Sequence, residues 1–116
     1  MAKIPKTSQS ETWQDYKMVA DQGEIDAMFK YGLMLATGEG NEMNKEEACR
    51  YLKMAADKGH LDAMFSYGVL LLSGEGVEMN KAEAGRYFKM AADKGEIGAM
   101  RKYGLMLREG DGIPVN

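Results

Sequence analysis

Residues 59–94 read GHLDAMFSYGVLLLSGEGVEMNKAEAGRYFKMAADK, and residues 23–58 repeat this stretch with 25 identities in 36 positions. The period extends beyond these two copies, because Tyr31, Tyr67 and Tyr103 lie at successive 36-residue steps. Self-similarity at this length is typical of solenoids, in which each unit buries its apolar face only by stacking on its neighbours. The sequence therefore predicts a stack of repeated units.

The composition sets limits on the partners. The chain has 116 residues, of which 45% are hydrophobic and 28% are charged, with a net charge of −3. Charges of both signs are interspersed, so the surface offers no general attraction for nucleic acid or an anionic membrane. No apolar run reaches 18 residues, so we expect no membrane span. Residues 1–11 are polar and contain no apolar signal segment, which favours a cytoplasmic, or at least intracellular, location.

Each repeat is predicted to contain two helices, and the first type, helix B, begins at a polar cap. Asn44 and Asn80 each precede a glutamate by three residues, and Ser8 precedes Glu11 in the same way. An asparagine or serine cap accepts a hydrogen bond from a free backbone N–H, and the glutamate three residues later can return one. Helix B is therefore predicted three times, near residues 9–21, 45–57 and 81–93.

The second type, helix A, is predicted near residues 25–37, 61–73 and 97–109, and a glycine ends each copy. Its apolar residues recur at helical spacing. Gly32, Gly68 and Gly104 lie in the middle of these helices, where glycine costs about 1 kcal/mol relative to alanine. A cost repeated at one position needs a compensating contact, and we expect close approach of the A and B backbones there.

Several motifs of the sequence resemble those of a known repeat family. The stretches that carry the resemblance are GHLDA at 59–63, YG at 67–68, GEGV at 74–77, NK at 80–81 and AA at 91–92. Together they resemble the Sel-1-like repeat, a relative of the tetratricopeptide repeat, and the resemblance covers residues 8–116. It implies an all-α, right-handed α-α superhelix of about six helices in antiparallel pairs. It also implies an adaptor or scaffold that helps to assemble protein complexes.

The expected organisation follows from the period and the two helix types. We predict a flexible tail, a half repeat containing helix B, two full repeats, and a half repeat containing helix A. These units are residues 1–7, 8–22, 23–58, 59–94 and 95–116.

The sequence contains no constellation typical of an enzyme, a metal site or a cofactor site. His60 and Cys49 are the single histidine and the single cysteine, so neither a histidine pair for zinc nor a Cys-His or Ser-His-Asp set is available around them. We expect His60 to be a solvated residue at the start of a helix, and Cys49 to be partly exposed packing surface. We therefore predict no catalysis, no metal and no cofactor.

Comparison of the copies separates the predicted core from the predicted surface. Methionine at 28, 64 and 100 and leucine at 35, 71 and 107 repeat unchanged, which predicts core positions. By analogy with tetratricopeptide repeats, the A helices line the concave face and bind a protein or peptide partner. The predicted contact residues are Asp26, Phe29, Leu33, Asp62, Phe65, Val69, Leu72, Arg101, Leu105 and Arg108.

Such a surface is apolar at one end and basic at the other, which suits an extended or helical peptide with apolar anchors and an acidic end. An alternative is that Phe29, Leu33, Phe65 and Val69 only complete the packing between successive A helices. For Arg101 and Arg108, which are also in the predicted set, we favour the alternative that they are solvated charges without a partner.

The two ends of the repeat pattern raise a second functional hypothesis. The pattern opens on a helix B without its own helix A, and Asn116 aligns with the caps at Asn44 and Asn80. Either the chain is a piece of a longer array, or another molecule covers the bare end. If that molecule is a second copy, the half repeats join head to tail and the chain is a structural self-assembling element.

Overall fold

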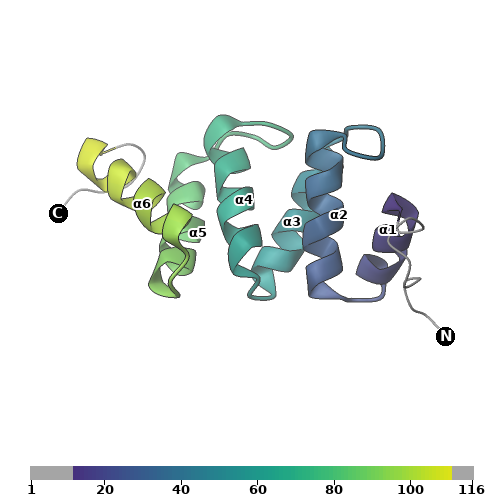
Figure 1. Ribbon diagram of the computed structural model, residues 1–116. Helices are drawn as coiled ribbons and strands as arrows, with labels where there is room; N and C mark the ends of the chain where they lie inside the picture. Colours follow the sequence, from purple (N-terminus) through teal and green to yellow (C-terminus); the bar gives the residue numbers. More distant parts are fainter. Residues whose placement is uncertain (1–11, 111–116) are drawn as a thin grey trace.

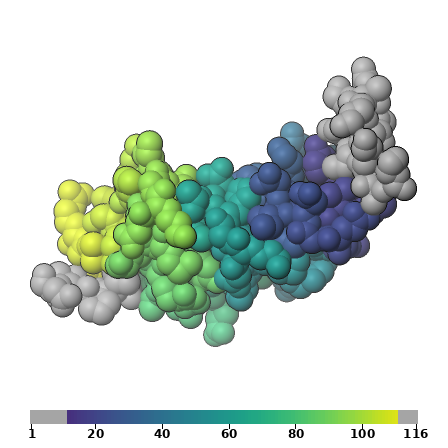
Figure 2. Space-filling view, turned by 90° about the horizontal axis from the view of Figure 1, so that it is seen from below, coloured from purple at the N-terminus to yellow at the C-terminus, as the bar shows by residue number. Residues whose placement is uncertain are grey.

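The computed structural model describes residues 12–110, and this part of the chain contains six α-helices and no β-strand (Figure 1). The helices are α1 (Trp13–Asp21), α2 (Ile25–Thr37), α3 (Lys45–Asp57), α4 (Leu61–Ser73), α5 (Lys81–Asp93) and α6 (Ile97–Glu109). Each helix packs against its neighbours in sequence, and α1 and α6 lie at opposite ends of an elongated array (Figures 1 and 2). The all-α repeat fold expected from the sequence is confirmed.

The predicted helices agree with the observed bounds except at the first one. Helix α1 begins at Trp13, after the extended residue Thr12, and not near residue 9. The cap predicted at Ser8 and Glu11, the tail at 1–7 and the aligned Asn116 all lie outside the described residues. The two complete helix pairs, α2–α3 and α4–α5, fall within the units predicted at 23–58 and 59–94.

The asparagine caps of the B helices form as expected, but the glutamates behave differently. The Asn44 side-chain oxygen accepts a hydrogen bond from the Glu47 backbone N–H at 3.1 Å, and Asn80 caps α5 in the same way. The Glu47 carboxylate, however, accepts a hydrogen bond from Arg50 Nε at 3.2 Å. The Asn44 backbone N–H already donates to the Leu35 carbonyl oxygen at 2.8 Å, and the charged guanidinium one turn along the helix is a strong donor for the carboxylate. This hydrogen bond from Arg50 holds the pKa of Glu47 below its usual value.

The glycines in the middle of the A helices make room for a side chain of the next helix B. A Cβ atom placed on Gly32 would lie 2.8 Å from Leu52, and one on Gly68 would lie 2.7 Å from the ring of Phe88. The expected close approach is therefore confirmed in position, but the contact is mainly between a glycine and a large apolar side chain. At Gly104 a Cβ atom would have no neighbour within 4 Å.

The loop between α4 and α5 packs on the preceding helix B. Gly76 has a φ of 77°, and a Cβ atom there would lie 2.3 Å from the carbonyl oxygen of Lys45. The Cys49 thiol donates to the carbonyl oxygen of Glu75 at 3.3 Å, and the Lys45 ammonium lies 2.8 Å from the Glu75 carboxylate. Cys49 is buried, contrary to the expectation of a partly exposed residue, because this loop covers it. Burial raises the pKa of its thiol.

A tyrosine links each helix B to the preceding one. The Tyr51 hydroxyl donates to Asp21 at 2.7 Å, and the Tyr87 hydroxyl donates to Asp57 at the same distance. The ring of Tyr87 also packs edge-on against Tyr67 of the intervening helix A. Each buried tyrosine therefore joins three successive helices.

The Tyr87–Asp57 bond predicts an acid-dependent loss of stability. Burial raises the pKa of Asp57, but hydrogen bonds from Lys53 and Tyr87 outweigh it and bring the pKa below 3.8. A carboxyl group of this kind stabilises the fold above its unfolded pKa, and the contribution is lost as the pH falls through the folded pKa. Because the Asp57 side chain is 46% exposed, we expect only about 1 kcal/mol from the bond.

Thermal unfolding of the wild type and of Tyr87→Phe tests this expectation. The variant should melt about 5 °C lower at pH 7, and the difference should shrink as the pH falls below about 4. If the difference in melting temperature stays constant down to pH 2.5, the contribution of the hydrogen bond does not depend on the ionised form of the Asp57 carboxylate.

Candidate protein-interaction surface

The residues predicted to contact a partner all lie on the A helices, α2, α4 and α6. The structure divides them into two groups by exposure. The exposed members are Asp26, Asp62, Arg101, Leu105 and Arg108. The partly buried members are Phe29, Leu33, Phe65, Val69 and Leu72.

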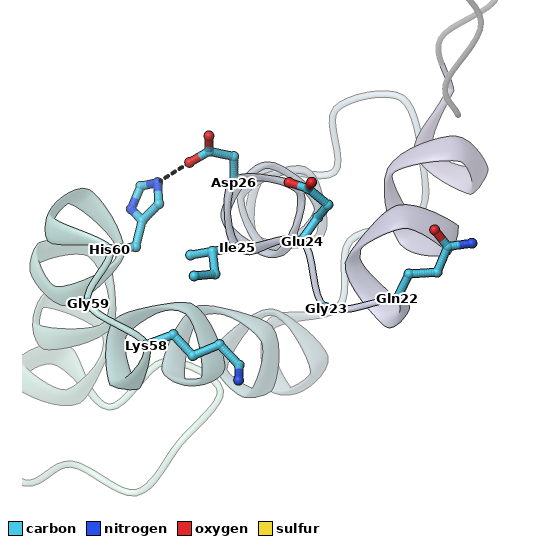
Figure 3. A pocket seen from close by; sticks show the side chains of 8 residues that line it. All are labelled: Gln22, Gly23, Glu24, Ile25, Asp26, Lys58, Gly59 and His60. Carbon is cyan, nitrogen blue, oxygen red and sulfur yellow. Dashed lines mark ion pairs between the residues drawn. The ribbon is translucent and has the colours of Figure 1, made fainter. Parts of the chain in front are cut away.

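Phe29 packs against the residue that caps the next helix A, α4. Its ring stacks on the His60 ring, with the centroids 4.4 Å apart. His60 Nδ1 accepts a hydrogen bond from the Ala63 backbone N–H at 3.1 Å, and Nε2 lies 3.2 Å from the Asp26 carboxylate (Figure 3). Because Nδ1 is an acceptor, the ring proton is on Nε2 and points to Asp26.

His60 therefore caps α4 and connects it to α2, and its side chain is only 15% exposed. The expectation of a solvated residue was wrong. The reason is that Phe29 and Asp26 come from the preceding repeat, whereas the sequence comparison considered only the local position. Glu96 occupies the equivalent cap on α6, where its carboxylate accepts from the Ala99 backbone N–H at 2.7 Å.

Phe65 makes the equivalent bridge one repeat later. A Cβ atom on Gly98, at the start of α6, would lie 3.2 Å from its ring, and the ring centroid is 5.9 Å from that of Phe88. Val69 and Leu72 also pack against the core. These contacts support the interpretation that the apolar residues complete the packing between successive A helices. Whether they also contact a partner stays a prediction.

Leu33 lines a shallow, mainly apolar depression of about 330 Å³. The residues around it come from α1, α2 and the following loop. They are Tyr16, Lys30, Leu33, Met34, Glu39 and Gly40. The depression lies at the first repeat and has room for an aliphatic side chain, so Leu33 remains available to a partner.

Two open depressions lie at the turns that lead into the A helices. The first, of about 620 Å³, is lined by residues 22–26 and 58–60 (Figure 3). The second, of about 440 Å³, is lined by residues 60–62 and 95–97, one repeat further along. Sequence reasoning missed these depressions. The repeated glycine of the turn is the signal that could have found them, because a glycine leaves the space beside the backbone empty. A Cβ atom on Gly59 would have no atom within 4 Å. The exposed carboxylates of both depressions make this edge acidic.

Three exposed residues of α6 form a stripe. Arg101, Leu105 and Arg108 lie at positions i, i+4 and i+7, which share a helix face. Within the described residues neither arginine forms an ion pair. The stripe therefore presents two cationic groups and an exposed leucine that the packing of the described helices does not use.

Residues 12–110 contain neither a metal-binding cluster nor a membrane-spanning helix. This part of the chain has no group of three or more histidine, cysteine, aspartate or glutamate residues placed to hold a metal ion. None of the described helices combines the length and the apolar character needed to cross a bilayer.

Two family models match the chain. The model of plant tetratricopeptide repeats matches residues 21–85, which is more than half of the chain, and the Sel1 repeat model matches residues 97–116. The chain belongs to the Sel1-like, tetratricopeptide-type repeat family. Repeats of this family typically mediate contacts between proteins. No curated protein matches the chain.

Solved structures resemble this Sel1-like chain closely. A Sel1 repeat protein from Oxalobacter formigenes is 32% identical over 88% of this chain, with a TM-score of 0.82. A protective antigen of uropathogenic Escherichia coli strains, which displays the same fold, is 33% identical over 86% of this chain, with a TM-score of 0.83. The Sel1-like chain covers 42% of the first protein and 21% of the second.

Proposed function

We propose that this Sel1-like chain is a non-catalytic interaction module that binds a peptide or protein segment along α2, α4 and α6. The observation that carries the proposal is the stripe of Arg101, Leu105 and Arg108. These side chains are exposed on a helix A, and the packing of the described helices does not need them. The depression at Leu33 supplies an apolar subsite at the other end of the same set of helices.

The charges of the surface suggest the chemistry of the partner. An acidic group would pair with Arg101 and Arg108, and an aliphatic or aromatic side chain would cover Leu105. A nucleic acid is a poorer fit, because the proposed surface also carries the exposed carboxylates of Asp26 on α2 and Asp62 on α4, and the net charge is −3.

A displayed library of short random peptides tests the proposal. Selected peptides should combine apolar anchors with acidic residues, and Arg101→Ala/Arg108→Ala should weaken their binding at least about tenfold. The matched control is Lys89→Ala/Lys94→Ala, which also removes two positive charges. Lys89 lies on α5, a B helix, and Lys94 directly follows that helix. Equal effects of the two double variants would mean that only net charge matters and would contradict the proposed surface.

Self-association is a second candidate function, because Met100 and Leu107 of α6 are exposed apolar residues at one end of the described array. Light scattering coupled to size-exclusion chromatography over a wide concentration range decides it. A dimer or a series of larger oligomers that grows with concentration supports self-assembly. A strict monomer leaves partner binding along the A helices as the proposed function.

A further inference from the structure

The residues before the A helices α2, α4 and α6 lie at the same repeat position but cap their helices differently. Glu24 forms no side-chain cap bond, and the Glu96 carboxylate accepts a hydrogen bond from the backbone N–H of Ala99. His60 caps α4 through Nδ1, which lies 3.1 Å from the backbone nitrogen of Ala63. Histidine is the side chain that ordinarily changes its charge between pH 5 and pH 8. The cap of α4 is therefore the one of the three that can respond to mild acid.

This cap needs the neutral form of the imidazole ring. Nδ1 of His60 accepts through its free electron pair, while Nε2 carries the proton and lies 3.2 Å from the Asp26 carboxylate. A second proton has to bind Nδ1, and the ring then turns an N–H group toward the N–H group of Ala63. It also places a positive charge at the positive end of the α4 dipole. Proton uptake therefore ends the cap bond.

The charged groups around the ring favour proton uptake. Asp26 faces Nε2 from α2, and Glu24 and Lys58 line the depression on the same side (Figure 3). Asp62 and Glu96 line the second depression, which also borders the ring. These four carboxylates outnumber the single ammonium group, so a positive ring is attracted to this edge. The Asp26 side chain is 82% exposed, however, and such a solvated ion pair contributes less than the cap bond that is lost.

We propose that His60 is a pH-sensitive cap, which releases the beginning of α4 from α2 in mild acid. When the ring takes up a proton at Nδ1, it gives up the Ala63 N–H and rotates toward the carboxylates of this edge. The ring also stacks on Phe29, with the centroids 4.4 Å apart, so its rotation uncovers Phe29 and loosens the junction between α2 and α4. The junction between α4 and α6 is capped by Glu96 and contains no histidine, so it should not respond. The switch is a property of the free chain and does not depend on partner binding.

Nuclear magnetic resonance of the isotope-labelled chain between pH 8 and pH 5 tests the cap directly. The amide proton signal of Ala63 should move upfield in step with the titration of the His60 ring, because the amide loses its acceptor. The amide of Ala99 is the internal control and should move much less, because its acceptor is Glu96. An Ala63 signal that stays constant while the ring titrates, or equal shifts of Ala63 and Ala99, would overturn the proposal.

Thermal unfolding measures the effect on stability. Because the folded chain uses the neutral ring, the contribution of the cap is present at pH 8 and is lost as the pH falls to 5. In His60→Asn the cap is uncharged at both pH values, and asparagine already caps α3 and α5 at Asn44 and Asn80. Between pH 8 and pH 5 the unfolding midpoint of the wild type should therefore fall by about 3–5 °C more than that of the variant. The Tyr87–Asp57 bond is present in both proteins, so it does not affect the comparison.

A second variant, His60→Glu, guards against an effect peculiar to asparagine. It places at α4 the residue type that caps α6, and its midpoint should follow that of His60→Asn. Each protein is compared with itself at two pH values, so a constant loss from removal of the ring cancels. The proposal fails if the wild-type midpoint changes with pH as in both variants, or rises relative to them in acid. No peptide takes part in these measurements, so failure of the library experiment leaves the proposal unaffected.

Discussion

Replacement of Phe88 by alanine is expected to lower the free energy of unfolding by about 3–5 kcal/mol. Phe88 is 0% exposed, and its ring fills the space over Gly68 between α4 and α5. Removal of the ring leaves a cavity between two helices that are joined by a loop and cannot collapse freely. Urea unfolding followed by circular dichroism measures the change, and a loss below about 1 kcal/mol would show that the ring contributes little.

The complementary change at Gly68 gives a sharper test of the same contact. Gly68→Ala in the wild type should cost about 1–3 kcal/mol, because its methyl group would lie 2.7 Å from the Phe88 ring. In the Phe88→Ala background the methyl group enters the cavity, so the cost should vanish or reverse. Additive effects in this double-mutant cycle would contradict the contact. Gly104→Ala is the control: it should gain up to about 1 kcal/mol from helix propensity alone.

Gly76→Ala is expected to cost about 3 kcal/mol or more, for two reasons. The residue has a φ of 77°, which a side chain disfavours, and its Cβ atom would lie 2.3 Å from the Lys45 carbonyl oxygen. The oxygen belongs to the backbone at the start of α3, so it cannot move aside as a flexible side chain can. The loop would have to lift, which would also expose the thiol of Cys49.

Gly59→Ala separates the two reasons. Gly59 also has a positive φ, of 100°, but a Cβ atom there would have no neighbour within 4 Å. This variant should therefore lose only the conformational contribution, about 1 kcal/mol. If urea unfolding gives equal losses for the two variants, the contact between the loop and α3 contributes nothing to stability.

Local features of the sequence were sufficient to predict where five of the six helices begin and end. The caps at Asn44 and Asn80 and the glycines that stop each helix act through bonds within a few residues. The predicted start of the first helix was wrong because the same capping pattern occurs twice. Ser8 and Thr12 each precede an acidic residue by three positions, and the local pattern does not choose between them.

The candidate surface was less predictable, because contacts between repeats decide it. The ten residues were correctly assigned to the A helices, but Phe29 and Phe65 turned out to bridge successive A helices. His60 and Cys49 were both expected to be more exposed than they are. In each case the covering group comes from another repeat, which a comparison of aligned positions does not reveal.

The sequence by itself determined the period, the helix pairs and the glycines at which α2 and α4 receive their neighbours, because these depend on hydrogen bonds and side-chain spacing along the chain. Only the tertiary structure decided which copies of a repeated residue are buried. Met64 and Met100 are both preceded by alanine and lie at the same helical position, yet one is in the core and the other is exposed. Burial is a property of the neighbouring helix, and within residues 12–110 the helices packed on α6 lie on one side of it only.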